Sequence, residues 1–532
     1  MVCGSTEKRG PLVTVVIPTH NRRGFLPVAL SSVLSQSYRD LQVIVVRDGG
    51  ERADDIVEGL RDRRVLFIDR DENLGKAASL NEALTRAEGK YIAYLDDDDM
   101  LYPYHVETLV DALESRMDCR LAYTDLYRVY CRTEPDGTRT VLSKVLDISR
   151  DFDRFLMLCF NHTLHVSLMH HRDLLDQTGP FNEDLKVLID WDFTRKAVFF
   201  TDFYHIRRIT GEFYSPVGGG DRLSHQGRRD ADAFTEGFLT IRTTRPAKPW
   251  SAVKDLAIII VAQRFGNSVA QMLEAIRRHT FYPCRVWLPL PGEDVAALKA
   301  GQGRGTVTIG GRTMPNVVPI AVDAATPAGG RIDAALDACD GDLVAVAPEG
   351  FPVRNFWIED SVYPLLAHPG TAFELEDSDA TRWAVVGTRE AISRARRSHP
   401  EMALRRALPA VDVAIRRVQP DEIPFQYDQL LEQAKARVAA RQWAQAAGMF
   451  EHIADRYGNE WWIRSLAANA HYHGGNFQRA GELCRHVNAR CPTVETLLLE
   501  GRLHRRAKDP ASAIPLLEKA VDSIDGRESL WT

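Results

Sequence analysis

Short hydrophobic runs alternate with amphipathic stretches over the first part of the chain. The runs of strand length are 13–18, 43–46, 65–68 and 91–95. Between them, apolar residues recur at helical spacing over 25–36 and 77–87. Short apolar strands separated by amphipathic helices predict an α/β fold with a parallel sheet. Ligands bind such sheets beyond the carboxyl ends of the strands, so the residues that follow these runs are the first candidates for a site.

Three of the predicted strand ends carry polar or glycine-rich sequences. They are Pro18-Thr19-His20-Asn21, Asp48-Gly49-Gly50 and the acidic run Asp96–Asp99. Four adjacent carboxylates repel one another and destabilise the fold unless a cation or solvent relieves them. Hard divalent cations such as Mg²⁺ and Mn²⁺ prefer carboxylate oxygens. Because the run directly follows a buried strand, we favour a metal site over a solvated acidic loop.

A second α/β pattern follows the Pro-rich linker Thr243–Trp250. Its first part, Ile258–Pro289, aligns without gaps on Val15–Val46, and apolar positions coincide. The acidic run is replaced there by Pro348-Glu349-Gly350-Phe351. We therefore predict a duplicated domain that has kept the fold and lost the metal chemistry. Two unrelated α/β units are the alternative.

From about residue 425 the chain reads as helical, with small residues at regular intervals. Ala446, Ala480 and Ala513 are spaced by 34 and 33 residues. A helix–turn–helix period of about 34 residues, with small side chains where helices cross, resembles tetratricopeptide repeats. About three repeats fit, and an irregular helical bundle is the alternative. Such repeats present a concave surface, to which we expect a protein partner or a substrate to bind.

Composition and charge narrow the classes of protein. Hydrophobic residues make up 45% of the 532 residues and charged residues 26%, which is typical of globular domains. The net charge of −6 argues against a nucleic-acid-binding protein. The eight cysteines form no CxxC pair, so we expect reduced thiols rather than a zinc site. The polar N-terminus and the lack of a long apolar run predict a cytoplasmic protein without a transmembrane segment, peripheral at the inner membrane face at most.

Three segments, in order along the chain, resemble glycosyltransferase family 2, which has the GT-A fold. They are VTVVIPTHNRRGFLPVALSSVLSQSYRDLQVIVVRDGG, ENLGKAASLNEALTRAEGKYIAYLDDDDMLYP and FNEDLKVLIDWDF, within roughly residues 10 to 230. The resemblance implies a nucleotide-diphospho-sugar donor, for which we expect a UDP-sugar, and Mg²⁺ or Mn²⁺ as cofactor. It also implies an acceptor hydroxyl, on a glycan, a lipid-linked molecule or a protein.

The resemblance further implies roles for the matching residues. The expected nucleotide contacts are Pro18, Thr19, Asn21, Asp48, Asn73, Gly75, Lys76, Asp96 and Asp97. Asp48 matches the acid that hydrogen-bonds the base, although Gly49-Gly50 departs mildly from the family's usual sequence there. Asp96 and Asp98 match the D-x-D motif that holds the metal, with Asp99 in support. In the glycine-rich loop 218–225, His225 or Arg222 is expected to touch the metal or the diphosphate.

The second acidic motif, LIDWDF, matches the acceptor side of the family. Asp190 is the expected general base, which takes the proton of the acceptor hydroxyl, and Asp192 is the second candidate. Trp191 offers an apolar face for a sugar ring. Two helix N-cap acids around a core tryptophan are the alternative. We also expect His162, between the two motifs, to contact the acceptor.

Together these residues predict three domains. They are a catalytic GT-A domain at 1–245, a degenerate non-catalytic GT-A-like domain at 254–405, and tetratricopeptide-like repeats at 425–532. The expected reaction is a metal-dependent, inverting sugar transfer, and the second domain, which lacks the acids, should bind no nucleotide sugar. The alternative is a catalytically weak or dead transferase-like protein that acts through its repeats. A nucleotidylyltransferase is disfavoured because THNRRGF holds only one glycine for a triphosphate loop.

Overall fold

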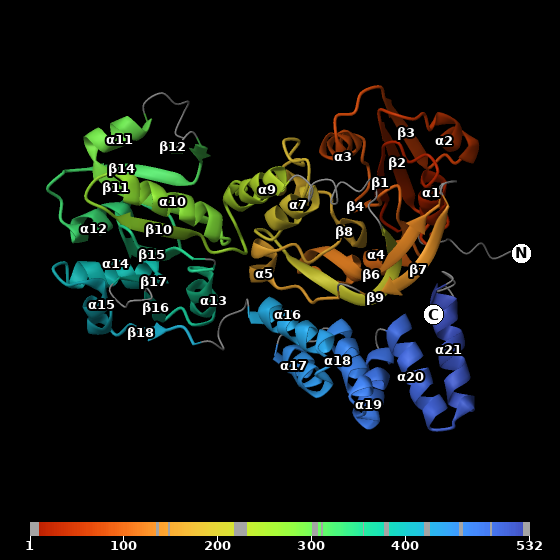
Figure 1. Ribbon diagram of the computed structural model, residues 1–532. Helices are drawn as coiled ribbons and strands as arrows, with labels where there is room; N and C mark the ends of the chain where they lie inside the picture. The colour runs from red at the N-terminus through yellow and green to blue at the C-terminus, as the bar shows by residue number, and fades with distance from the viewer. Residues whose placement is uncertain are drawn as a thin grey trace, which may run out of the picture. The chain divides into compact units, whose positions relative to one another are not determined.

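The N-terminal sheet has the predicted parallel core. The computed structural model describes residues 10–134, 138–146, 149–217, 231–299, 307–309, 312–354, 356–376, 382–419, 426–456, 461–489 and 492–524 (Figure 1). Nine strands in these residues form the sheet: β1 (Val13–Thr19), β2 (Leu41–Asp48), β3 (Val65–Arg70), β4 (Tyr91–Tyr94), β5 (Met100–Leu101), β6 (Cys119–Thr133), β7 (Arg139–Val145), β8 (Leu168–His171) and β9 (Asp202–Pro216). Their order is β3-β2-β1-β4-β8-β6-β9-β5, and β7 pairs with β6. Strands β3, β2, β1 and β4 are parallel, as predicted.

Helices separate or follow these strands along the chain. They are α1 (Leu26–Leu34), α2 (Asp54–Leu60), α3 (Lys76–Thr85), α4 (His105–Ser115), α5 (Arg154–Cys159), α6 (Leu174–Thr178), α7 (Ile189–Ala197) and α9 (Ala231–Thr243). Val13, Val15 and Ile17 alternate along β1 and share one core with residues of α1 and α4. This alternation follows from the two-residue period of a strand. Since β1, β2 and β4 are parallel, the polar residues after them lie along one edge of the sheet.

The second sheet repeats seven strands of the first, all except β5 and β7. Its strands are β10 (Leu256–Val261), β11 (Cys284–Pro291), β14 (Val317–Val322), β15 (Leu343–Pro348), β16 (Thr371–Glu376), β17 (Trp383–Thr388) and β18 (Ala414–Arg417), while β12 (Val307–Ile309) and β13 (Arg312–Met314) pair separately. Its helices are α10 (Asn267–His279), α11 (Gly292–Lys299), α12 (Ala328–Ala338), α13 (Glu359–Ala367), α14 (Arg389–Ser398) and α15 (Leu404–Ala407). The order β14-β11-β10-β15-β17-β16-β18 corresponds to β3-β2-β1-β4-β8-β6-β9, with the same direction in every pair.

The register of the two sheets also agrees. Val15 lies opposite Val43 in the first sheet, and Ile258 lies opposite Val286 in the second. These are the same pairs of positions that the ungapped sequence alignment superposes. The predicted second α/β domain with the same fold is therefore confirmed.

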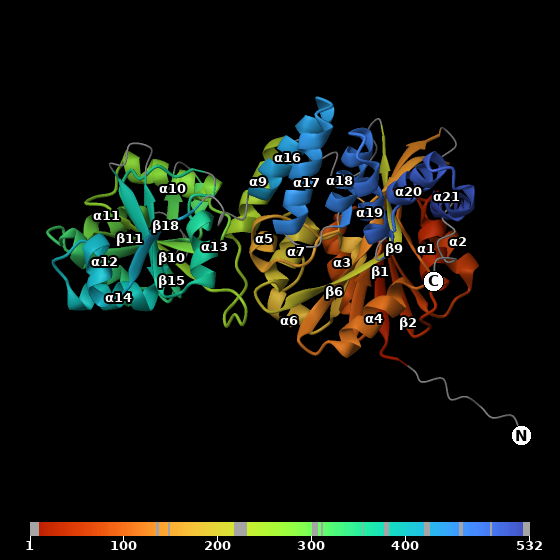
Figure 2. The same cartoon turned by 90° about the horizontal axis from the view of Figure 1, so that it is seen from below.

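The C-terminal region is helical in the described residues (Figure 2). Its helices are α16 (Gln426–Ala439), α17 (Trp443–Arg456), α18 (Trp461–His473), α19 (Phe477–Asn488), α20 (Val494–Arg506) and α21 (Pro510–Ile524). The helices α17, α19 and α21 begin at intervals of 34 and 33 residues (443 to 477 and 477 to 510). Ala446 and Ala480 are fully buried, as small residues at helix crossings should be. The helical period is confirmed, and assignment to the tetratricopeptide family stays a prediction.

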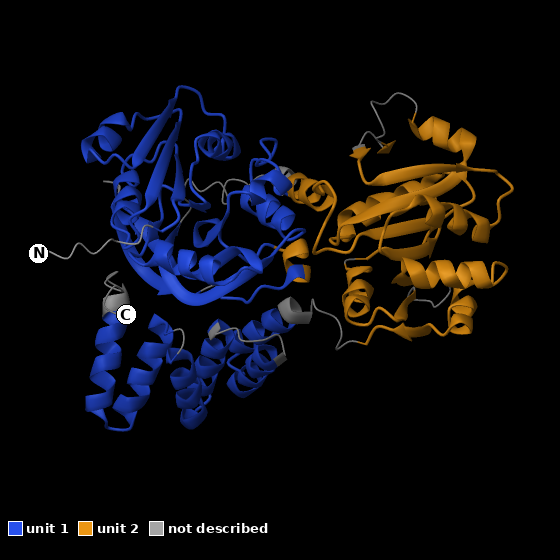
Figure 3. Cartoon of the chain, turned by 180° about the vertical axis from the view of Figure 1, so that it is seen from behind, with its two compact units in different colours: residues 1–154, 161–234, 426–532 blue, residues 155–160, 235–425 orange. Residues whose placement is uncertain are grey.

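The chain forms two compact units (Figure 3). One comprises residues 1–154, 161–234 and 426–532, and the other residues 155–160 and 235–425. The C-terminal helices thus share a unit with the N-terminal sheet, although the second sheet separates them in sequence. The three predicted domain ranges remain predictions. Among the described helices, none is both long and apolar enough to cross a membrane.

Candidate active site

The acidic run lies just beyond the end of β4. Asp97, Asp98 and Asp99 are only 4%, 6% and 4% exposed, whereas Asp96 is partly exposed. Asp96, Asp98 and Asp99 each offer a carboxylate oxygen, and these oxygens lie within 4.8 Å of one another. An all-oxygen set of this kind suits Mg²⁺ or Mn²⁺. The structure therefore brings together the two predicted metal ligands and adds Asp99 to them.

Three basic side chains surround these acids. Lys76, the first residue of α3, forms an ion pair with Asp96. Arg22 pairs with Asp97 at 3.2 Å and with Asp98 at 2.7 Å. Arg139 of β7 donates to the backbone oxygen of Asp98 at 2.6 Å. The sequence indicated Lys76 but missed both arginines, although Arg22 directly follows the polar end of β1.

Burial and neighbouring charges shift the pKa values of Asp96 and Asp97 in opposite directions. Burial raises the pKa of Asp97 to about 6, and Arg22 opposes this shift only in part. Burial acts on Asp96 in the same direction, but the Lys76 ammonium outweighs it and lowers the pKa of Asp96 to about 2. Asp97 Oδ2 is buried and has no hydrogen-bond partner among the described residues. A bound divalent cation would supply further positive charge to these closely spaced carboxylates.

The predicted nucleotide contacts at the ends of β1 and β2 form one hydrogen-bonded group. The two carboxylate oxygens of Asp48 accept from the backbone nitrogens of Leu74 and Gly75, each at 2.8 Å. Asn21 adopts a left-handed backbone conformation with φ of 53°. Asn21 and Asn73 both lie within hydrogen-bond distance of His20 Nε2, at 3.0 and 3.2 Å. Asp48 thus shapes the loop before Lys76, and its bond to a base stays a prediction.

Asp190 lies in the first turn of α7, after Leu188 in a left-handed conformation. Asn161 Nδ2 donates to Asp190 Oδ2 at 2.9 Å. Burial raises the pKa of Asp190, while Lys76 and Asn161 oppose that shift. Lys76 also interacts with Asp96, so this ammonium connects the acceptor-side acid with the acidic run. Sequence analysis missed Asn161, since nothing local marks an asparagine that bonds a residue 29 positions away.

The neighbours of Asp190 have different environments. Asp192 is 2% exposed and pairs with Lys196 at 2.6 Å, one helical turn further on. Trp191 is completely buried. The expectation that Trp191 stacks on a sugar ring is therefore wrong, because this side chain has no exposed face and fills the core beneath α7.

Three histidines between the two acidic motifs, His162, His165 and His170, belong to the interior. His162 is 6% exposed, which leaves little surface for the predicted acceptor contact. His165 stacks on Tyr94 with ring centroids 4.1 Å apart, and His170 lies 2.9 Å from the Tyr94 hydroxyl. His225 and Arg222 lie outside the described residues, so their predicted role is untouched by the structure.

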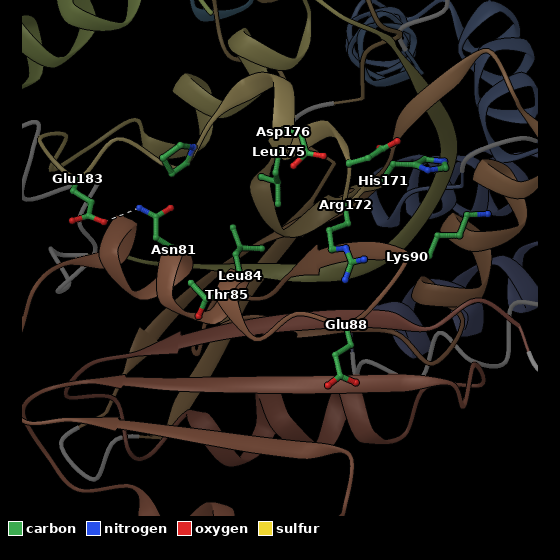
Figure 4. Close-up of a pocket in the computed structure, with 12 residues that line it drawn as sticks. Asn81, Leu84, Thr85, Glu88, Lys90, His171, Arg172, Leu175, Asp176 and Glu183 are labelled. Atoms are coloured by element: carbon green, nitrogen blue, oxygen red, sulfur yellow. Dashed lines mark hydrogen bonds between the residues drawn. The ribbon is translucent and has the colours of Figure 1, made fainter.

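A large open pocket of about 960 Å³ lies elsewhere on the N-terminal sheet domain. Figure 4 shows its lining residues on α3, β8 and α6, with Asn81 bonded to Glu183. Neither the acidic run nor Asp190 is among the residues that line it. This pocket is therefore not the predicted donor site.

The corresponding strand ends of the second sheet are closed by other residues. Glu349 is the only acid of the segment 348–351 that takes the place of the acidic run. Near the ends of β11 and β14, Arg331 is 1% exposed. Its guanidinium donates to the backbone oxygens of Pro289, Ala324 and Thr326 at 3.0 to 3.1 Å. Arg331 therefore fills part of this edge, and the position that corresponds to Asp48 is Pro291. The nearest acid after β11, Asp294, is already paired with Arg264 and bonded to the backbone nitrogen of Phe265.

The fold and the acidic site define a GT-A-type transferase domain. Residues 14–163 match the profile of "Glycosyl transferase family 2". This part of the chain is thus similar to glycosyltransferase family 2, as its motifs predicted.

Curated relatives share this part of the chain. An uncharacterized glycosyltransferase of Methanocaldococcus jannaschii is 30% identical over 199 residues, which are 36% of this chain and 66% of that protein. The chondroitin synthase of Escherichia coli is 29% identical over 228 residues, 41% of this chain and 31% of that protein. The chain thus spans less than two thirds of either relative.

Two solved structures of glycosyltransferases show a partial similarity to this chain. Staphylococcus aureus TarS 1–349 in complex with UDP-GlcNAc is 19% identical, with a TM-score of 0.35 over 43% of this chain and 65% of that one. The mannosyltransferase PcManGT of Pyrobaculum calidifontis, in complex with GDP-Man and Mn²⁺, is 19% identical, with a TM-score of 0.33 over 45% of this chain and 67% of that one.

Proposed function

We propose that the protein is an inverting, metal-dependent glycosyltransferase that uses a nucleotide-diphospho-sugar, with UDP as the expected nucleotide. The observation that carries this proposal is the presence of two acidic sites in one domain that is similar to family 2. One is the cluster Asp96, Asp98 and Asp99, and the other is Asp190, with Lys76 interacting with both. A donor needs the first site and an acceptor needs the second.

The acidic cluster fits the donor side of this reaction. Asp96, Asp98 and Asp99 would hold Mg²⁺ or Mn²⁺, whose charge stabilises the departing diphosphate. Lys76 and Arg22, which neutralise the acids in this structure, lie where they can turn to diphosphate oxygens instead. The loop that Asp48 fixes, from Leu74 to Lys76, would lie along the nucleotide.

Asp190 fits the acceptor side. Asn161 donates to Asp190 Oδ2, which helps to orient this carboxylate toward an acceptor hydroxyl. Asp190 would take the hydroxyl proton as the oxygen attacks the anomeric carbon. A single displacement of this kind inverts the anomeric configuration. Asp192 is already engaged by Lys196, so we assign the base to Asp190.

Release of nucleoside diphosphate tests the proposal on the full chain. Incubation with a UDP-sugar and Mn²⁺ should release UDP, slowly to water and faster with an acceptor, and EDTA should stop the release. The alternative, a catalytically dead transferase-like protein that acts through its helical repeats, would release no UDP. Absence of release with every nucleotide sugar, in the presence of Mn²⁺, would reject the enzyme in favour of that rival.

The pH dependence of transfer should report on Asp190. Asp190 acts as a base only when it is ionised, so the rate is full above its pKa and falls as the pH decreases through it. Burial raises this pKa, and Lys76, Asp96 and Asn161 are the groups that modify it. Asn161→Ala removes a hydrogen bond that favours the ionised form. We expect the acidic limb of kcat to move to higher pH by roughly one pH unit. An unchanged limb would contradict the contact between Asn161 and the base.

The second sheet should bind no nucleotide sugar. It lacks the acids that hold the cation, and Arg331 occupies the edge that would receive the base. Calorimetric titration of the full chain with a UDP-sugar and Mn²⁺ should give one site per chain, which Asp98→Asn eliminates. A second site that survives this substitution would show that the duplicated domain has kept a binding function.

A further inference from the structure

The last C-terminal helices pack on the N-terminal sheet at a surface that leads to the acidic run. One hydrophobic cluster joins the two parts and contains Tyr102, Tyr127, Val129, Leu146, Ile209, Val487, Val494, Leu497 and Ala520. The Tyr127 hydroxyl donates to the backbone oxygen of Pro492 at 3.4 Å, just before α20. Figures 1 and 2 both show α20 and α21 near the strands β7 and β9. We call this cluster the helix-docking cluster.

Tyr102 connects the helix-docking cluster to the acids through the main chain. It follows Asp99 by three residues, at the end of the short strand β5. Strand β5 pairs with β9, where Met100 lies opposite Glu212. The backbone nitrogen of Tyr102 also donates to Thr210 at 2.8 Å. The segment 100–102, which follows the acidic run, therefore bonds to β9 along its length. Its last residue, Tyr102, packs in the helix-docking cluster.

A buried ion pair lies between the cluster and the acids. Lys144 of β7 donates to Glu212 of β9 at 2.5 Å, and these residues are 3% and 1% exposed. The hydroxyls of Tyr102 and Tyr214 donate to the two oxygens of Glu212 at 2.7 and 2.9 Å. Because a buried charge is costly unless it is fully bonded, the four side chains fix one another's positions.

The same two strands hold two of the acids directly. The backbone nitrogen of Tyr214 donates to Asp99 Oδ1 at 2.9 Å. Arg139 of β7 lies with its guanidinium carbon 4.6 Å from the centre of the Tyr214 ring and donates to the backbone oxygen of Asp98. Divalent cations require their oxygen ligands at defined positions, and neighbours that orient the ligands set the affinity.

We propose that α20 and α21 act in cis as a brace for the metal site, with Tyr102, Glu212, Lys144 and Tyr214 as the positioning residues that connect the helix-docking cluster to Asp98 and Asp99. The C-terminal helices then support the catalytic domain itself, besides any partner they bind. This inference rests on the proposed metal site. It follows that loosening the helices should weaken metal binding even though no helix residue is a ligand.

Two neighbouring residues of α21 allow a matched test. Ala520 is fully buried in the helix-docking cluster, while Val521 is 52% exposed. Ala520→Asp and Val521→Asp add the same charge at nearly the same distance from the acids, but only Ala520→Asp separates the helices from the sheet. Binding of Mn²⁺ alone to the full chain is measured from the loss of the free-ion EPR signal. We expect Ala520→Asp to weaken Mn²⁺ binding about tenfold or more, and Val521→Asp to leave it unchanged.

Tyr102→Phe keeps the test decisive if Ala520→Asp fails to fold. The phenylalanine ring stays in the helix-docking cluster, and the bond to Glu212 is lost. We expect Tyr102→Phe to weaken Mn²⁺ binding by about threefold or more. The control is Tyr38→Phe, whose hydroxyl donates to Pro11 remote from the acids and whose effect should be far smaller.

The brace is overturned by one result. In it, Tyr102→Phe and any folded Ala520→Asp protein bind Mn²⁺ like the wild type, while Asp98→Asn does not. Wild-type protein whose Mn²⁺ binding is absent or insensitive to Asp98→Asn overturns both the brace and the proposed metal site.

Discussion

Asp98→Asn is expected to reduce sugar transfer to background, by more than about a hundredfold. The substitution removes one of three carboxylates that meet within 4.8 Å, and Asn cannot supply the lost charge. Asp98 is 6% exposed and pairs with Arg22, so it is not the surface site that an acidic loop suggests. The fold should nevertheless persist, because Asn has the same size and because the loss of one charge relieves repulsion among the acids.

Asp118→Asn is the control for this experiment. Its side chain is 65% exposed in the turn before β6 and lies outside the acidic cluster. Transfer rates and melting temperatures of both variants would be compared with those of the wild type. Near wild-type turnover of Asp98→Asn would show that the metal assignment is wrong.

Asp190→Asn should lower kcat by roughly two to four orders of magnitude, with little loss of donor binding. The carboxylate is the group that takes the proton, whereas the amide of Asn can only keep the shape. Asp192→Asn is the matched substitution, two residues further along α7. Since Asp192 is bonded to Lys196 and only 2% exposed, its loss should lower the melting temperature more than it lowers kcat.

Single-turnover kinetics with a bound UDP-sugar would separate the two roles. If Asp192→Asn loses kcat while Asp190→Asn keeps it, the two acids exchange roles. If neither variant loses kcat, the acceptor proton leaves by another route. The assignment of a base on α7 is then wrong, and only the donor site is supported.

Local sequence patterns were sufficient for the parallel core of the first sheet, for its repetition in the second and for the C-terminal helices. Strand-length runs and their periodicity predicted the parallel strands, and the ungapped alignment of Val15–Val46 on Ile258–Pro289 predicted the register that the two sheets share. The small residues Ala446 and Ala480 predicted the helical period. These features depend on residues that are close in sequence or repeated at a fixed interval, and both are readable from one chain.

The supports of the site depend on distant pairings that no local pattern records. Arg139 reaches Asp98 across 41 positions, and Tyr214 reaches Asp99 across 115. Both pairings arise because β6 pairs with β7, which carries Arg139, and with β9, which carries Tyr214. These pairings bring both strands to the acids. Trp191 was misjudged for a related reason. Its position between two acids suggested an exposed site, and only the packing of α7 shows that it is buried.

Thermal unfolding of the full chain with a panel of nucleotide sugars tests the central claim most directly. Ligands that bind only the folded protein raise the melting temperature, and the rise grows with the ratio of ligand concentration to Kd. The account predicts that one class of nucleotide sugar, with UDP-sugars first, raises it in the presence of Mn²⁺, and that EDTA or Asp98→Asn removes the effect. No stabilisation by any nucleotide sugar, or stabilisation that persists in Asp98→Asn with EDTA, would contradict a donor site built on the acidic run.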